Sequence, residues 1–337
     1  MQIYSSPEFW GDYHVNFPVT ASHPTNGMRT RMSALHYALE FEVITDIKDA
    51  KGDLLIEPFA IKPREEDRKE LAEKGWPAVE WEALEYLYAQ QVSDYSGGKK
   101  YLICSEMEVL RWRGNLRKKV LSTMSGIFTT CDYQENLLKV VGVDSKRLPE
   151  PINEFLFYPG LKKRKQIVAT GNASHVKNTE MLIAFYRALE GKGYHRVYIG
   201  GPLVWGYVDP ADKHFRYNME LYHELKTVCD AFHEPSPGTK VARIFSESEF
   251  YVNFAYYEVG CRTALEALMC GCGVIWGQHP LGKELPVLCQ ASTVEAAVDA
   301  LESNTGKINI KRLRNHALKH HSYASVRKQV KRHFNAN

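Results

Sequence analysis

The feature that most constrains the fold is an alternation of short β-rich runs with helical patterns, which stops near the middle of the chain and then starts again. The first half is predicted to contain strands at 43–45, 54–56, 101–104 and 126–130, and helices at 29–40, 65–74, 80–91, 110–124 and 133–141. The second half is predicted to contain strands at 166–170, 196–200, 250–254 and 273–276, and helices at 178–189, 262–269 and 295–302. This alternation is typical of parallel α/β domains.

The stretch between the two halves is rich in proline and charge, which suits an interdomain linker. At 337 residues the chain is long enough for two domains of ordinary size. We expect a first domain at 1–150, a linker at 151–165, a second domain at 166–305 and a basic helical segment at 306–337. Two such domains would face each other across a cleft, and small ligands bind outside the carboxyl ends of the strands.

Composition and short motifs argue against several classes of protein. No stretch is apolar over the roughly 18 residues that a membrane span needs, and the first residues lack the pattern of a secretion signal, so a cytoplasmic protein is expected. The seven cysteines have no C-x-x-C spacing, which favours reduced thiols over a zinc site or a disulfide framework. A dehydrogenase is disfavoured because no G-x-G-x-x-G follows a predicted strand.

The net charge is only +3, but the cations are unevenly distributed. Residues 307–337 contain nine Lys or Arg and no Asp or Glu, and residues 111–119 contain five cations around one Trp. A single basic run is usually a solvated helix face. Two such runs in a nearly neutral chain favour an anionic partner.

The most informative segment runs from Tyr256 to Trp276. Glu258 follows a predicted strand, Gly260 permits a tight turn, and a helix is predicted to begin near Arg262. Amides at such a helix start favour a bound pyrophosphate. Glu266 lies eight residues after Glu258, about two helical turns along. Spacing alone leaves two interpretations open. Either both carboxylates contact one elongated ligand, or Glu258 interacts with the helix dipole and Glu266 is a solvated glutamate on the helix.

This segment resembles the E-x7-E motif of the retaining GT-B glycosyltransferases typified by sucrose and glycogen synthases. The resemblance implies that Glu258 contacts the donor sugar and Glu266 contacts the nucleotide ribose. It also implies that amides of the turn after Gly260 hold the diphosphate, here those of Cys261, Arg262 and Thr263. The implied donor is a nucleotide sugar, with a UDP sugar expected, and no metal or other cofactor is expected.

Two further segments resemble the same family in the same order, so that the resemblance covers roughly residues 100–290. Residues 149–159 are similar to its linker, and 166–179 to the entry to its second domain. Lys177 then matches the lysine that neutralises the leaving diphosphate, an electrostatic role. The chain departs from the family at Asn172, where an arginine is common. Arg262 or another cation is a candidate to replace it, and the alternative is a diphosphate that is held less tightly. Asn172 itself stays a candidate donor-binding residue.

The first half contains candidates for the rest of the site. Gly27, in the loop 20–31, resembles a glycine loop that approaches the donor phosphates, although an ordinary β–α turn would look the same. Residues 104–116 are similar to phage α-glucosyltransferases that modify hydroxymethylcytosine in DNA, and that similarity puts Glu106 in the place of a cleft carboxylate. DNA contacts are expected from the basic run that follows, at Arg111, Trp112, Arg113, Arg117 and Lys118.

The resemblance therefore implies an α/β protein of the GT-B type with two Rossmann-like domains, acting as a retaining glycosyltransferase. The domain at 1–150 is expected to bind the acceptor and the domain at 166–305 to bind the nucleotide sugar. The predicted acceptor is a 5-hydroxymethylated pyrimidine in phage DNA, with Trp112 stacking on or wedging beside a displaced base; a phage-encoded enzyme would act in the host cytoplasm. One alternative is the same chemistry on a saccharide, lipid or protein acceptor. Another is a non-catalytic nucleic-acid-binding protein on a degenerate transferase fold.

Overall fold

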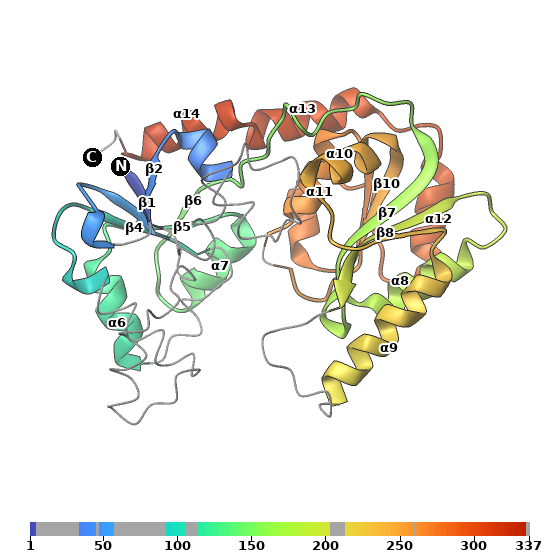
Figure 1. Cartoon of the computed structure of the whole chain (residues 1–337), viewed down its shortest axis with the longest axis horizontal. Coiled ribbons are helices and arrows are strands. Elements are labelled where there is room, and N and C mark those ends of the chain that lie inside the picture. Colours follow the sequence, from blue (N-terminus) through green and yellow to red (C-terminus); the bar gives the residue numbers. More distant parts are fainter. Residues whose placement is uncertain are drawn as a thin grey trace. The chain divides into compact units, whose positions relative to one another are not determined.

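The computed structural model describes residues 1–4, 34–44, 47–56, 92–104, 114–202, 213–258 and 260–334. These residues form two compact α/β units (Figure 1). Among them, the first unit contains the residues up to Pro151 together with those from Val326 onward, and the second contains Ile152–Ser325. The predicted helices at 65–74 and 80–91 lie outside the described residues. None of the described helices is both long and apolar enough to cross a membrane.

The first unit is built on a six-stranded parallel sheet in the order β2-β1-β3-β4-β5-β6. Its strands are β1 (Gln2–Tyr4), β2 (Glu42–Ile44), β3 (Leu54–Ile56), β4 (Lys100–Ile103), β5 (Gly126–Thr129) and β6 (Lys146–Arg147). Its described helices include η1 (Ile47–Asp49), α6 (Gly114–Thr123) and α7 (Asp132–Val140). Every residue of β3 and β4 is buried, as expected for parallel strands covered on both faces.

The second unit is built on another six-stranded parallel sheet, in the order β12-β11-β10-β7-β8-β9. Its strands are β7 (Arg164–Ala173), β8 (His195–Pro202), β9 (Ala231–His233), β10 (Ser248–Asn253), β11 (Gly273–Trp276) and β12 (Cys289–Gln290). Its helices are η2 (His175–Lys177), α8 (Thr179–Ala188), α9 (Lys213–Val228), α10 (Gly238–Glu247), α11 (Arg262–Met269), η3 (Pro280–Glu284), α12 (Val294–Asn304) and α13 (Ile310–His321).

The order of these strands places a topological switch point between β7 and β10. From β7 the chain proceeds to β8 and then β9 on one side, and it returns to place β10, β11 and β12 on the other side. The loops that leave β7 and β10 therefore run in opposite directions. Ligands of open parallel sheets bind outside the carboxyl ends of the strands at such a point.

Strands β7 and β8 approach each other so closely that one position requires glycine. A Cβ on Gly200 would lie 1.8 Å from the backbone oxygen of Gly171, the oxygen that also accepts a hydrogen bond from the Tyr198 hydroxyl. We expect Gly200→Ala to lower the free energy of unfolding by about 3 kcal/mol or more, because backbone must move. Gly201→Ala is the matched control, since its Cβ would make an ordinary 3.5 Å contact with Pro235. Equal urea midpoints for the two variants would contradict this.

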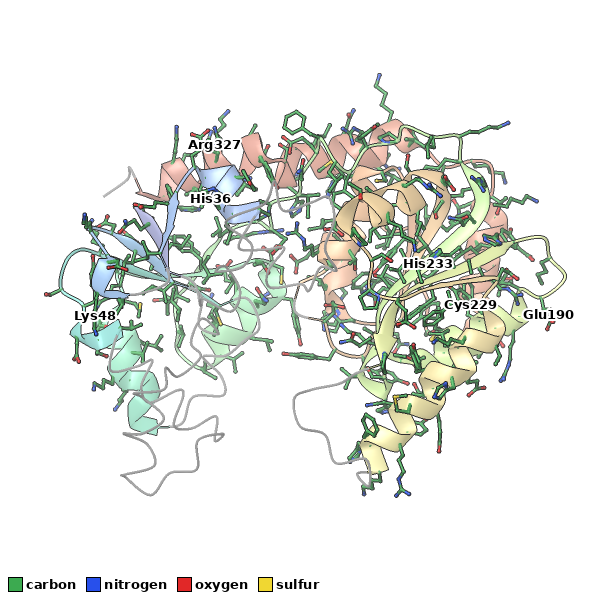
Figure 2. All side chains as sticks on the ribbon, in the orientation of Figure 1. His36, Lys48, Glu190, Cys229, His233 and Arg327 are labelled. Atoms are coloured by element: carbon green, nitrogen blue, oxygen red, sulfur yellow. The ribbon has the colours of Figure 1, made fainter. Side chains whose placement is uncertain are left out.

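The basic C-terminal segment forms α13 and α14 (Tyr323–Phe334), and α14 passes from the second unit into the first. Within the first unit, Arg327 of α14 lies beside the helix at residues 34–39, near His36 (Figure 2). Its guanidinium donates to the backbone oxygens of Ala38 (2.6 Å) and Tyr37 (3.2 Å) and pairs with Glu40 at 2.8 Å. Carbonyls at a helix C-terminus lack intrahelical partners, so Arg327 stabilises this helix end.

Candidate active site

Polar side chains meet where three neighbouring strands of the second unit end. Lys177 follows β7, Glu258 follows β10 and His279 follows β11. Lys177 Nζ lies 2.8 Å from Glu258 Oε2, and these side chains are 33% and 13% exposed. The amide of Asn253, the last residue of β10, donates to the same carboxylate oxygen at 3.4 Å. A partly accessible ion pair therefore occupies the switch point between β7 and β10.

A tight turn between β7 and α8 fixes Lys177. The Ser174 backbone N–H donates to the Thr179 hydroxyl, and that hydroxyl donates to the Ser174 carbonyl oxygen, each at 2.9 Å. Asn178 has φ +50° and ψ +49°, a left-handed conformation that asparagine tolerates better than most residues, and its side chain accepts from the Met181 N–H. These contacts hold the backbone on both sides of Lys177.

The segment that carries Glu258 is attached to that same turn. The Tyr256 N–H donates to the backbone oxygen of Val176 at 3.1 Å. The Asn253 side-chain oxygen accepts from the Ala255 N–H at 2.9 Å. Two loops that follow different strands are thus joined next to the ion pair, which fixes the distance between Lys177 and Glu258.

Helix α11 begins beside this loop. Cys261 at the N-cap makes no side-chain cap hydrogen bond, and the first turn contains no acidic residue. The Thr263 hydroxyl lies 2.9 Å from the hydroxyl of Tyr251 in β10, which directs this side chain toward the sheet. The positive dipole end of a helix whose first turn has no acidic residue favours an anionic ligand. Gly260 is partly exposed next to it.

Glu266 and Arg262 form a buried ion pair on α11. Arg262 Nε lies 3.0 Å from Glu266 Oε1, and the side chains are 8% and 6% exposed. Glu266 is therefore not a solvated surface glutamate, and Arg262 is engaged with it. Asn172 is exposed near the end of β7 and lies opposite Gly201 in β8.

His279 also lies at this site, although no sequence motif points to it. Its Nδ1 accepts from the Leu281 N–H at 3.3 Å and so caps η3. Burial lowers the pKa of His279; the nearby Glu258 carboxylate opposes this shift, and Lys177 adds to it. No sequence signal would have found His279, because histidine is not a typical capping residue and its neighbours are brought to it by the sheet.

The lowered pKa of His279 predicts how stability depends on pH. The folded protein binds this proton more weakly than the unfolded chain, so protonation favours unfolding. The stability due to neutral His279 is fully present above its ordinary pKa of 6.5 and is lost as the pH falls below that value. His279→Asn retains a capping oxygen but cannot titrate. In urea titrations from about pH 7 to about pH 5, we expect this variant to lose less unfolding free energy than wild type; parallel losses would contradict the prediction.

Several predicted site residues lie outside the described part of the chain: Gly27, Glu106, Arg111, Trp112 and Arg113. Arg117 and Lys118 lie in α6, where Lys118 is exposed. Within the described ranges, no group of three or more His, Cys, Asp or Glu residues is arranged to hold a metal ion.

Comparison with protein-family models found no match, and neither did comparison with curated protein sequences. Solved structures do match over nearly the whole chain. Sucrose-phosphate synthase from Thermosynechococcus elongatus is 16% identical, with 99% of this chain and 98% of that chain covered and a TM-score of 0.66. Anabaena HepE in complex with UDP and glucose is 10% identical, with full coverage of both chains and a TM-score of 0.64.

The chain has the GT-B fold. A third match, AviGT4, a glycosyltransferase involved in avilamycin A biosynthesis, is 11% identical and has a TM-score of 0.60, with 99% and 96% of the two chains covered. The expectation of an α/β protein with two Rossmann-like domains is confirmed by these matches together with the two parallel sheets. At such low identity the similarity shows the fold, and function must be argued from the site.

Proposed function

We propose that this protein transfers a sugar from a nucleotide-sugar donor to an acceptor hydroxyl. The observation that carries the proposal is the ion pair between Lys177 and Glu258 at the switch point, next to the start of α11, whose first turn has no acidic residue. A cation and a helix start suit the diphosphate of such a donor, and the carboxylate suits sugar hydroxyls. Among the proteins of similar fold, HepE was solved with UDP and glucose, which supports a UDP sugar as donor.

In the proposed reaction, Lys177 and the first amides of α11 hold the diphosphate and stabilise the charge that develops on it. Glu258 orients the sugar, and Glu266, held by Arg262, binds the ribose hydroxyls. The acceptor oxygen forms a bond to the anomeric carbon while the bond from that carbon to the phosphate oxygen breaks. The hydroxyl proton passes to the departing phosphate oxygen. Attack from the face that the diphosphate leaves retains the configuration at the anomeric carbon.

The acceptor that we propose is a 5-hydroxymethylated pyrimidine in DNA, such as a phage genome modified in the host cytoplasm. This rests on the similarity of residues 104–116 to phage DNA α-glucosyltransferases and on the distribution of cations. The acid-free C-terminal stretch exposes seven cations: Lys307, Lys311, Arg312, Lys319, Lys328, Lys331 and Arg332. Exposed cations of this kind bind phosphates and release counterions.

The test is nucleoside mass analysis of hydroxymethylcytosine-containing DNA after incubation with the protein and a mixture of nucleotide sugars. A mass increase of one hexose or pentose supports the transfer and the acceptor together. If nucleoside diphosphate is released only when a saccharide, lipid or protein acceptor is added, the protein is a glycosyltransferase but DNA is not its acceptor. DNA binding with no binding of any nucleotide sugar refutes the transferase and favours a non-catalytic protein.

A further inference from the structure

Three aromatic side chains from three elements gather beside the ion pair; we refer to His175, Tyr217 and Tyr256 as the aromatic rim. The ring of His175 in η2 lies 5.5 Å from that of Tyr256, which follows β10, and 6.4 Å from that of Tyr217 in α9, measured between centroids. Tyr256 is 61% exposed and Tyr217 is 42% exposed. A cluster of large aromatic side chains exposed to solvent indicates a ligand-binding surface.

Hydrogen bonds hold the aromatic rim in place. One oxygen of Glu180, in the first turn of α8, bonds both His175 Nδ1 (2.7 Å) and the Tyr217 hydroxyl (2.9 Å). The bond to Glu180 raises the pKa of Tyr217, so its hydroxyl remains a donor. The packing of α8 against α9 supports this arrangement (Figure 1). The backbone N–H of His175 also donates to the side-chain oxygen of Asn218 at 3.2 Å. A fixed set of rings loses little conformational entropy when a ligand binds.

The aromatic rim borders the proposed donor site along the chain. His175 lies two residues before Lys177, and Tyr256 lies two residues before Glu258. The hydrogen bond from Tyr256 to Val176 joins the two loops at this point. A ring that stacks on the aromatic rim is therefore held next to the residues that hold the donor sugar, where an acceptor must lie.

Charges of both signs surround the aromatic rim, and the exposed cations lie at the start of α9. Helix α9 begins with exposed Lys213 and Arg216 and has no acidic residue in its first turn. Lys213 lies one turn before Tyr217 on the same helix face. Cations at a helix N-terminus oppose the helix dipole, so their placement suits a bound anion. Farther along α9, the Glu220 and Glu224 carboxylates also raise the pKa of Tyr217, and Glu224 is paired with Arg187 at 2.7 Å.

We propose that the aromatic rim stacks the base of the acceptor nucleotide, with its phosphate near Lys213 and Arg216. This rests on the proposed transfer to a nucleic acid and names where the displaced base is held. A neutral saccharide suits the aromatic rim less well. The Glu180 oxygen nearest the rings is already engaged by His175 and Tyr217, and the exposed charges at the start of α9 are positive.

The test uses a single-stranded oligodeoxynucleotide with 2-aminopurine at one position, because stacking quenches the fluorescence of this base. Tyr256→Leu is expected to weaken binding by about 5- to 150-fold, which is ~1–3 kcal/mol at about 1.4 kcal/mol per tenfold, and to abolish most of the quenching. Tyr256→Phe keeps the ring and should bind as wild type does. Tyr158→Leu removes a tyrosine that is 53% exposed outside the aromatic rim, and should have no effect.

The phosphate contacts are tested by salt dependence. Lys213→Gln and Arg216→Gln should each reduce the slope of log affinity against log salt by about 1, whereas Lys240→Gln, an exposed lysine on α10, should not. The inference is overturned if Tyr256→Leu binds the oligonucleotide as tightly as wild type does. It is also overturned if a methyl glycoside competes with the oligonucleotide for wild type and Tyr256→Leu abolishes this competition. UDP-glucose binding, measured by calorimetry without nucleic acid, tests the proposed donor separately. If wild type does not bind it, the proposed function fails while the oligonucleotide result still decides the role of the aromatic rim.

Discussion

Glu258→Gln is expected to lower kcat for sugar transfer by about 10²–10³-fold, and Lys177→Ala by a similar factor, with the fold intact. The two side chains meet at 2.8 Å at the switch point, so each change removes a charge placed where the donor's sugar and diphosphate are proposed to bind. Effects on kcat should exceed those on the KM of the donor, because the charge on the leaving group develops during the reaction.

A second Lys–Glu pair of the same unit provides matched controls. Lys192 and Glu302 lie 2.7 Å apart and are 41% and 47% exposed, away from the loops that follow β7 and β10. Lys192→Ala and Glu302→Gln should retain the kcat of wild type. If Glu258→Gln and Lys177→Ala also retain it while all variants unfold at the same urea concentration, the assignment of the site is wrong.

Glu266→Ala is expected to lower the free energy of unfolding by about 3–5 kcal/mol, because it removes the carboxylate that pairs with a buried arginine. Arg262 and Glu266 are 8% and 6% exposed, so water cannot replace the lost partner without rearrangement. Urea denaturation followed by circular dichroism measures the difference. Replacing both residues, as Arg262→Met with Glu266→Leu, should recover part of the loss, since an apolar pair leaves no unpaired charge.

The control for this prediction is a pair with the same sequence spacing on a more exposed helix. Arg243 and Glu247 of α10 are also four residues apart, but Arg243 is 74% exposed and the distance is 3.7 Å. Removing the Arg243 charge by Arg243→Gln should therefore cost no more than ~1 kcal/mol. If Glu266→Ala lowers the free energy of unfolding by no more than Arg243→Gln does, burial of the Arg262–Glu266 pair contributes little to stability.

Much of the fold could be predicted from sequence, because buried parallel strands leave a local signal. The predicted strands at 54–56, 101–104, 250–254 and 273–276 overlap β3, β4, β10 and β11, each of which contains a short run of apolar residues. Helix α9 was not predicted. Its buried positions Leu221, Tyr222, Leu225 and Val228 are spread among many charged residues, so its apolar stripe is weak. Helix α10 follows Pro237 and begins with Gly238, which together indicate a turn rather than a helix.

What the sequence by itself determined is local: the alternating strands and helices, and the placement of Glu258 and Glu266 on one short segment. Tertiary structure alone decided which distant residues meet. Lys177 and Glu258 are 81 positions apart and pair because β7 and β10 are neighbours, and strand order cannot be read from periodicity. His279, the aromatic rim and the close approach of Gly171 to Gly200 arise in the same way. A hydrophobic pattern specifies that a strand is buried but not which strand lies beside it, and the chemistry of this site depends on that neighbour.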